Sequence, residues 1–83
     1  MFSHVTVETV IDRISVFPYT LENKKKRAKC VILTEDKKRF SFFANVEGKY
    51  FDMILLTQNK DAVRFEYDCD GYGLEFFQNQ TIE

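Results

Sequence analysis

Several residue types that would point to a particular chemistry are scarce in this chain. Its 83 residues include one His, two Cys, three Gly, one Pro and no Trp. Three glycines provide no glycine-rich phosphate loop, and a lone histidine, His4, provides neither a catalytic base with partners nor metal-ligand spacing. The segment from Asp68 to Gly71 begins like a calcium loop but stops after two Asp, so a turn is expected there. We therefore expect no enzyme, no cofactor and no metal site.

The chain also lacks a long apolar run and a set of paired cysteines. No stretch approaches the roughly 18 apolar residues of a membrane-spanning helix, and residues 1–4 lack a basic region followed by an apolar one. Cys30 and Cys69 match neither a disulfide framework nor a metal motif. We therefore expect a cytoplasmic protein that contacts no membrane, with both cysteines reduced and buried.

Aromatic and charged residues, by contrast, are plentiful. Nine Phe and four Tyr make up 16% of the chain, and 30% of the residues are charged. A chain of this size buries only about 60% of the surface that its unfolded form exposes. We therefore expect one domain over residues 1–83, with a core built on a few large rings.

The first half of the chain has the pattern of β-strands. Residues 5–17 are rich in β-branched residues, and their apolar positions change parity between Val7 and Val10, which predicts a bulged strand. Pro18 is expected to end this strand because it lacks an N–H. The remaining pattern predicts a polar loop over 20–27, then a hairpin made of a strand over 28–34, a turn over 35–38 and a strand over 39–44.

The second half contains one predicted helix and a second hairpin. The positions at helical spacing are Tyr50, Phe51, Ile54, Leu55 and Gln58, with Asn45 or Glu47 near the start and Asn59 near the end. Val63, Phe65 and Tyr67 alternate with polar residues, which predicts a strand over 62–68. The Asp70-Gly71 pair predicts a turn, followed by a returning strand over 73–78 and a frayed tail over 79–83.

The predicted order is a long bulged strand, a hairpin, a helix and a second hairpin. This order, carried by VIDRISVF, KCVILTEDKKRFSFFA and FDMILLTQNKDAVRFEYD, resembles the OB-fold superfamily. The resemblance covers most of the chain and concerns the fold, not a particular protein. It implies a mainly β chain that forms a small five-stranded OB-type barrel, with one short helix between strands three and four. Another small β barrel, or a curved sheet packed on one helix, is the alternative.

Positive charge is concentrated in one stretch. From Lys24 to Arg39 there are eight Lys or Arg and two acidic residues, whereas the rest of the chain has four Lys or Arg and eleven acidic residues. OB folds bind oligonucleotides on strands two and three and on the loops after strands one and four. The resemblance therefore places this basic stretch on the ligand-binding side.

The alternation of strands two and three separates a core face from an outer face. The residues expected to point inward are Cys30, Ile32, Phe40 and Phe42, and those expected to point outward are Lys29, Val31, Leu33, Arg39, Ser41 and Phe43. Cations beside an exposed ring are what phosphate contact and base stacking require. The candidate nucleic-acid-binding residues are Lys24, Lys25, Lys26, Arg27, Lys29, Arg39, Phe43 and Tyr72.

Two functions are compatible with these features. The first is binding of single-stranded DNA or RNA through the basic loop and the outward aromatic residue. The second is a protein–protein interaction, as a regulator or inhibitor of a nucleic-acid enzyme, or self-association into a homodimer. A net charge of −1 and apolar residues on both faces of strand two favour this second function, and the acidic remainder of the chain suits a basic partner.

Overall fold

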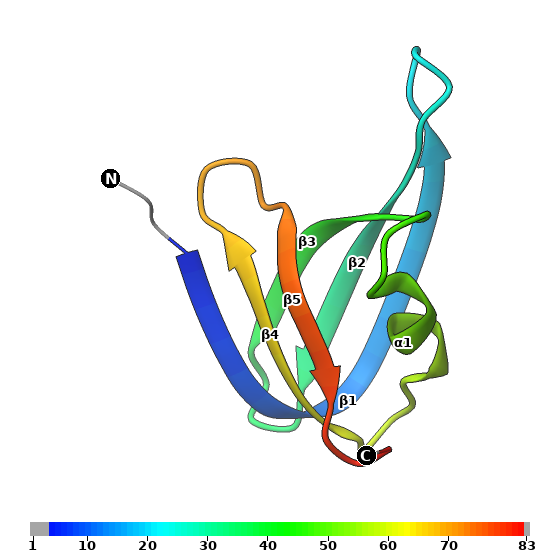
Figure 1. Ribbon diagram of the computed structural model, residues 1–83. Coiled ribbons are helices and arrows are strands. Elements are labelled where there is room, and N and C mark those ends of the chain that lie inside the picture. Colours follow the sequence, from blue (N-terminus) through cyan, green and yellow to red (C-terminus); the bar gives the residue numbers. More distant parts are fainter. Residues whose placement is uncertain (1–3, 83) are drawn as a thin grey trace.

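Five strands and one helix make up the computed structural model, which describes residues 4–82 (Figure 1). The elements are β1 (His4–Thr20), β2 (Lys26–Thr34), β3 (Arg39–Asn45), α1 (Phe51–Leu56), β4 (Ala62–Asp68) and β5 (Leu74–Asn79). Residues 1–3 and 83, which belong to the N-terminal segment and to the predicted tail, lie outside the described part.

The strands form one sheet with the order β3-β2-β1-β4-β5, and each pair of neighbours is antiparallel. The end strands come together at a parallel bridge between Phe43 and Gly73, where the Phe43 N–H donates to the Tyr72 carbonyl over 2.6 Å. The sheet therefore curls into a barrel whose β3–β5 seam is joined at that point and is not closed along its length (Figure 1). This is the predicted mainly β, OB-type arrangement, with the short helix between strands three and four.

β1 belongs to both halves of the barrel. Its first half pairs with β4, its second half pairs with β2, and the register shifts between Ile11 and Arg13. The shift confirms the predicted bulge, which lets Ile11 face the core on one side of it and Ile14 on the other. The change of parity therefore comes after Ile11, so Val10 does not share the face of Ile14 as expected.

Pro18 does not end β1, contrary to the expectation from the sequence. The strand continues past it, and Pro18 is paired with Ala28 of β2. β4 pairs with β1 only as far as Val10, so at Pro18 the strand has a neighbour on one side alone, and a proline is tolerated on such an open edge. β2 accordingly starts early, and Lys26 and Arg27 belong to this strand rather than to the predicted loop.

Large rings fill the core, as the composition predicts. Phe42, Phe65 and Phe77 are at most 3% exposed, and the Phe42 ring centroid lies 5.3 Å from that of Phe65 and 6.4 Å from that of Phe77. β4 supplies Val63, Phe65 and Tyr67 to this core in the predicted alternation and with the predicted bounds. The core thus lies between the two hairpins, with every strand contributing to it.

The helix is shorter than predicted. Phe51 and Ile54 of α1 are buried, but Leu55 is 57% exposed, so only one side of this short helix faces the core. Neither Asn45 nor Glu47 starts the helix, because Asn45 Oδ1 accepts the N–H of Glu47 over 3.0 Å and forms a turn before it.

β5 extends into the predicted tail. Asn79, expected in a frayed end, is the last residue of β5 and is fully buried. Its side-chain amide donates to Thr57 Oγ1 over 3.2 Å and to Asp61 Oδ2 over 3.0 Å, and its Oδ1 accepts the Thr81 N–H over 3.0 Å. Buried polar groups require such partners, so Asn79 ties the end of β5 to the segment after α1.

Candidate nucleic-acid interface

The outer side of β2 and β3 carries four of the eight predicted site residues, and the second half of β1 extends this surface. Residues paired across antiparallel strands share a face. The register places Phe17 of β1 beside Lys29 of β2, and Lys29 beside Phe43 of β3. We call this surface the cationic face, and its residues are Arg13, Ser15, Phe17, Tyr19, Arg27, Lys29, Val31, Leu33, Arg39, Ser41 and Phe43. None of these residues is acidic.

Phe43 lies where the cationic face meets the β4–β5 turn. The Arg27 guanidinium carbon lies 5.8 Å from the Phe43 ring centroid, and the Tyr19 ring meets the Phe43 ring edge-on with centroids 6.3 Å apart. The hydrogen bond from the Phe43 N–H to Tyr72 ties this part of β3 to the β4–β5 turn. Tyr72 and Phe17 are more than half exposed, at 51% and 56%. At this end of the face, rings therefore lie beside cations, in the rows Phe17–Lys29–Phe43 and Tyr19–Arg27.

A hollow of about 260 Å³ brings three of the predicted residues together. Its lining consists of Lys29, Ser41, Phe43 and Tyr72, and we call it the Phe43–Tyr72 hollow. Two aromatic side chains and an ammonium group around a space of this size suit a planar heterocycle that carries a phosphate nearby. The structure thus joins Tyr72 to Lys29 and Phe43, which lie far from it in the sequence.

The basic stretch divides into parts that serve different surfaces. Arg27 lies on the cationic face, and with Lys25 of the β1–β2 loop it lines a second hollow of about 350 Å³. Lys24 lies exposed in the same loop, with a positive φ of 67°. Lys26 is the exception, because successive residues of a strand point to opposite sides and its neighbour Arg27 is on the cationic face. Lys26 therefore lies outside the cationic face.

Phe17 and Tyr19 belong to the cationic face but were not predicted to do so. They extend the alternation that starts at Arg13, and the strand carries this alternation through Pro18. Taking Pro18 as the end of the strand excluded Tyr19, whereas Phe17 lay within the predicted strand and was not assigned to a face. The signal that would reveal them is the continued alternation of Ile14 and Val16, which face the core, with residues that do not.

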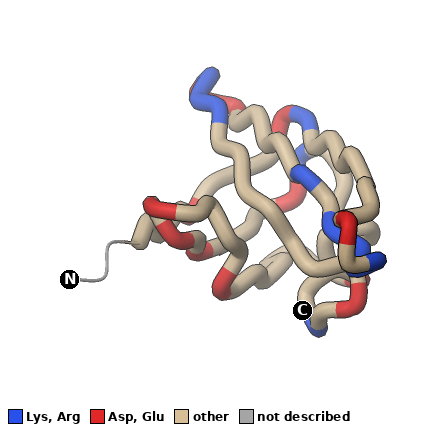
Figure 2. Tube along the Cα trace, turned by 90° about the horizontal axis from the view of Figure 1, so that it is seen from above, with Lys and Arg blue, Asp and Glu red and all other residues tan. Residues whose placement is uncertain are grey.

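The first half of β1, together with β4 and β5, carries the opposite charge. The register places His4 beside Asp68 and Thr6 beside Glu66. We call this surface the acidic face, and its residues are His4, Thr6, Glu8, Arg64, Glu66, Asp68, Phe76 and Gln78. Arg64 and His4 both lie near Glu66, at 3.9 Å and 3.6 Å. Figure 2 shows a group of acidic positions on the side of the molecule that holds the N-terminal end.

The acidic residues of the two turns have ordinary structural partners. Asp68 Oδ1 accepts the Asp70 N–H over 3.0 Å, which makes the predicted turn. Asp36, in the predicted turn between β2 and β3, accepts a hydrogen bond from the Thr34 hydroxyl, which lowers the pKa of this exposed carboxyl group. Within residues 4–82, no group of three or more His, Cys, Asp or Glu is arranged to hold a metal ion.

The two cysteines are free but differ in environment. Cys30 is fully buried, and its burial raises the pKa of the thiol to about 11. Cys69 is only partly buried, so the expectation of two buried thiols is right for Cys30 alone. In the part of the chain that the structure describes, no helix has the length and apolar character needed to cross a membrane.

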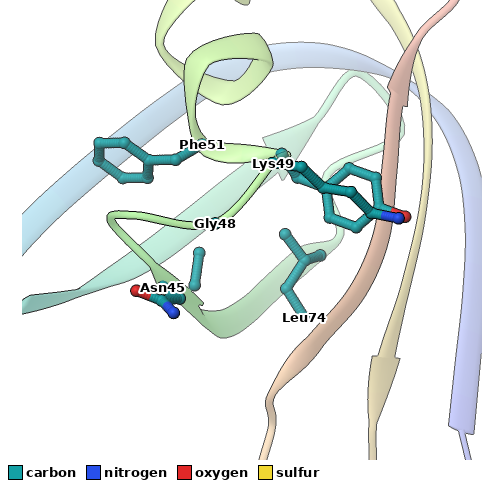
Figure 3. Close-up of a pocket in the computed structure, with 7 residues that line it drawn as sticks. Asn45, Gly48, Lys49, Phe51 and Leu74 are labelled. Carbon is teal, nitrogen blue, oxygen red and sulfur yellow. The ribbon is translucent and has the colours of Figure 1, made fainter.

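A third hollow, of about 190 Å³, opens where β3 and β5 separate (Figure 3). Phe51 and Leu74 form part of its apolar lining, and a Cβ at Gly48 beside it would make a tight contact of 3.0 Å with the Asn45 carbonyl oxygen. Its one charged residue, Lys49, places its ammonium 5.0 Å from the Tyr50 ring centroid. This hollow contains none of the predicted site residues.

Comparisons with protein-family models, with curated proteins and with solved structures found no match to this chain.

Proposed function

We propose that this chain is a non-enzymatic member of the OB-fold superfamily that binds single-stranded DNA or RNA on its cationic face. The observation that carries the proposal is the placement of rings beside cations, in the rows Phe17–Lys29–Phe43 and Tyr19–Arg27, on a surface with no acidic residue. Superfamily membership is supported by the strand order and by the position of this surface, since OB folds bind oligonucleotides on the same strands.

A single strand suits this face better than a duplex. The rings of Phe17, Phe43 and Tyr72 can stack only on bases whose faces are free, and a duplex keeps its base faces stacked on each other. Stacking of this kind tolerates any sequence, because every base has a π-face. The rings therefore supply affinity for unpaired bases in general.

The cations supply the contact with phosphate. Arg27 and Lys29 flank Phe43, so a base stacked on that ring has its backbone within the field of both charges. Neutralising phosphates releases condensed counterions, which makes the affinity fall as salt rises. The acidic face lies on the other half of the barrel and repels a polyanion, which confines the strand to the cationic face.

A titration with labelled single-stranded DNA and RNA of about ten nucleotides, at low and at moderate salt, tests this proposal. We expect affinity that falls with salt, and no comparable binding of a duplex of the same length. No binding of either single strand at low salt would refute the proposed function.

Lys26 and Lys29 form a matched pair of variants for the same titration. Both residues are exposed lysines of β2, but only Lys29 lies on the cationic face. We expect Lys29→Gln to weaken binding and to reduce the slope of log affinity against log salt by about 0.7, the value for one phosphate contact with a single strand. Lys26→Gln should leave the slope unchanged. Equal effects of the two substitutions would mean that general positive charge, and not the cationic face, binds the strand.

A protein partner is the alternative proposal, as expected for a regulator or inhibitor of a nucleic-acid enzyme or for a homodimer. The observations that favour it are the acidic face, which suits a basic partner, and the adjacent residues Leu55 and Leu56 of α1, which are 57% and 60% exposed. Light scattering over a range of protein concentrations measures self-association directly. We place either activity in the cytoplasm, which the two free cysteines support.

A further inference from the structure

The hollow at the end of the cationic face carries positive charge only. It lies between the β1–β2 loop and the ends of β2 and β3, and we call it the Arg27–Asn45 hollow. Its volume is about 350 Å³, and within residues 4–82 its lining consists of Leu21, Asn23, Lys25, Arg27 and Asn45. Lys25 and Arg27 are cations, and the other three side chains are uncharged. The charge of this lining therefore favours an anion.

The two asparagines of the lining have amide oxygens that already accept hydrogen bonds. Asn23 Oδ1 accepts the Lys25 N–H over 3.1 Å, and Asn45 Oδ1 accepts the Glu47 N–H over 3.0 Å. The other end of each amide is an NH₂ group, which donates and cannot accept. The polar side chains of the lining therefore offer mainly N–H donors, and two of them are charged, which suits the oxygens of a phosphate group.

Arg27 joins this hollow to Phe43. Its guanidinium carbon lies 5.8 Å from the Phe43 ring centroid, and the same side chain lines the hollow. A guanidinium has five N–H donors in one plane, so it can lie over a ring and still donate to a phosphate. The register places Asn45 beside Arg27, two residues along β3 from Phe43, which is about 7 Å along the strand. A base on Phe43 and a phosphate in the hollow can therefore belong to one short piece of a single strand.

We propose that the Arg27–Asn45 hollow is a binding site for a phosphate group. In a bound single strand, this group is the phosphate nearest to the base that stacks on Phe43. That placement rests on the proposed function, whereas the affinity of the hollow for phosphate does not. Phosphate contacts position a nucleic acid without reading its bases, so the hollow fixes where the strand lies on the cationic face.

A titration with inorganic phosphate, followed by NMR of the side-chain amide groups, tests the site without any nucleic acid. Chloride keeps the ionic strength constant. We expect a saturable shift of the NH₂ signals of Asn23 and Asn45, and no comparable shift for Asn59, which is exposed in the segment after α1. This segment and the β1–β2 loop lie at opposite ends of the barrel (Figure 1). Equal shifts of all three asparagines, or no shift of any, would overturn the site.

Asn45→Asp and Asn59→Asp add the same negative charge inside and outside the hollow. Aspartate at position 45 loses the NH₂ donors but keeps an acceptor for the Glu47 N–H, so the turn before α1 is retained. We expect Asn45→Asp to abolish the shift of Asn23 by phosphate and to weaken single-strand binding about tenfold or more, because like charges repel. Asn59→Asp should do neither. Equal weakening by the two variants would overturn the placement of the strand.

Lys24 and Lys25 provide a second matched pair. Both are exposed in the β1–β2 loop, but of the two only Lys25 lines the hollow. We expect Lys25→Gln to reduce the slope of log affinity against log salt by about 0.7, the value for one phosphate contact with a single strand. Lys24→Gln should leave the slope unchanged. Equal slopes for the two variants would show that no phosphate of the strand occupies the hollow.

The outcomes separate this inference from the proposed function. Phosphate shifts at Asn23 and Asn45 without binding of any single strand would overturn the proposed function and support the phosphate site. Single-strand binding that Asn45→Asp does not change, together with an absence of phosphate shifts, would overturn the site and leave the proposed function in place.

Discussion

The cationic face and the acidic face are two halves of the same barrel, and they share the strand β1. Both are outer surfaces of antiparallel strands over one continuous aromatic core. The bulge between Ile11 and Arg13 separates them, because β1 leaves β4 and joins β2 at that point. One half presents Arg27, Lys29 and Arg39, and the other presents acidic groups.

The difference shows how a chain with a net charge of −1 can still present a surface for a polyanion. Net charge describes the attraction between distant molecules, whereas binding depends on the charges within about 10 Å of the contact at ordinary salt. The spatial separation of the charges, more than their sum, therefore decides what each face can bind. The substitutions below test this separation.

The largest effect is expected from Phe42, which lies next to Phe43 in the sequence but on the opposite side of β3. Phe42 is fully buried, so Phe42→Ala should lower the free energy of unfolding by about 3–5 kcal/mol, the usual cost of removing a buried ring. Phe43→Ala should change stability little, because that ring faces outward. Urea denaturation measures both. Equal destabilisation by the two substitutions would show that β3 has no outer face of the kind described.

The next largest effect is expected on the affinity for a single strand, when one aromatic residue is removed from each face in turn. Phe43→Ala should weaken single-strand binding by about 1–3 kcal/mol, the range for one stacked base. Phe76→Ala removes a ring of the acidic face, paired with Glu66, and should leave binding unchanged. Fluorescence titration of both variants with the same oligonucleotide checks this contrast. If Phe76→Ala weakens binding as much, the strand is not confined to the cationic face.

A smaller effect is expected when acid weakens the hydrogen bond between Asn79 and Asp61, which joins the end of β5 to the segment after α1 and contributes to the stability of the fold. The hydrogen bond from Asn79, with a second from the Gln58 N–H, lowers the pKa of the Asp61 carboxyl group. A lowered pKa means that the folded state favours the ionised form, so this stabilisation is present above the unfolded pKa and is lost as pH falls through the folded value.

Thermal unfolding of the protein and of the Asn79→Ala variant, at pH 7 and below pH 4, measures this contribution. The variant should be less stable at pH 7, because it leaves polar groups without a buried partner. The difference between the two proteins should shrink in acid. A difference that does not depend on pH would assign the stabilisation to packing of Asn79 alone.

The smallest effect on stability is expected from chemical labelling of the cysteines, of which each half of the barrel contains one. At pH 8 a thiol reagent should label Cys69 in the folded protein and leave Cys30 unmodified, because Cys30 is buried and its pKa is raised to about 11. Labelling should leave the melting temperature nearly unchanged. Mass spectrometry identifies the labelled residue, and rapid labelling of Cys30 would contradict the packing of β2 against the core.

The hairpins and the inner faces of their strands could be predicted from local patterns. Val63, Phe65 and Tyr67 alternate with polar residues, and a strand with one buried face requires that period, so the sequence determined both the bounds and the inner face of β4. The parity change in the first strand likewise required a bulge, although its position after Ile11 depended on where β4 gives way to β2.

Local signals failed where the outcome depended on a neighbour from elsewhere in the chain. Pro18 stays within β1 because no strand pairs with its other side there, and Asn79 is buried because Asp61 and Thr57 lie next to it. Neither fact can be read from adjacent residues.

In the candidate site, too, some features follow from the local sequence and others depend on distant segments. The sequence by itself determined that Lys29 and Phe43 face away from the core, because successive strand residues alternate between two sides. Only the tertiary structure added Phe17 to their surface and brought Tyr72 to the edge of β3, because strand pairing and the closing of the barrel join segments that are distant in the chain. The composition of each strand is local, whereas the surface formed by several strands depends on their order and register.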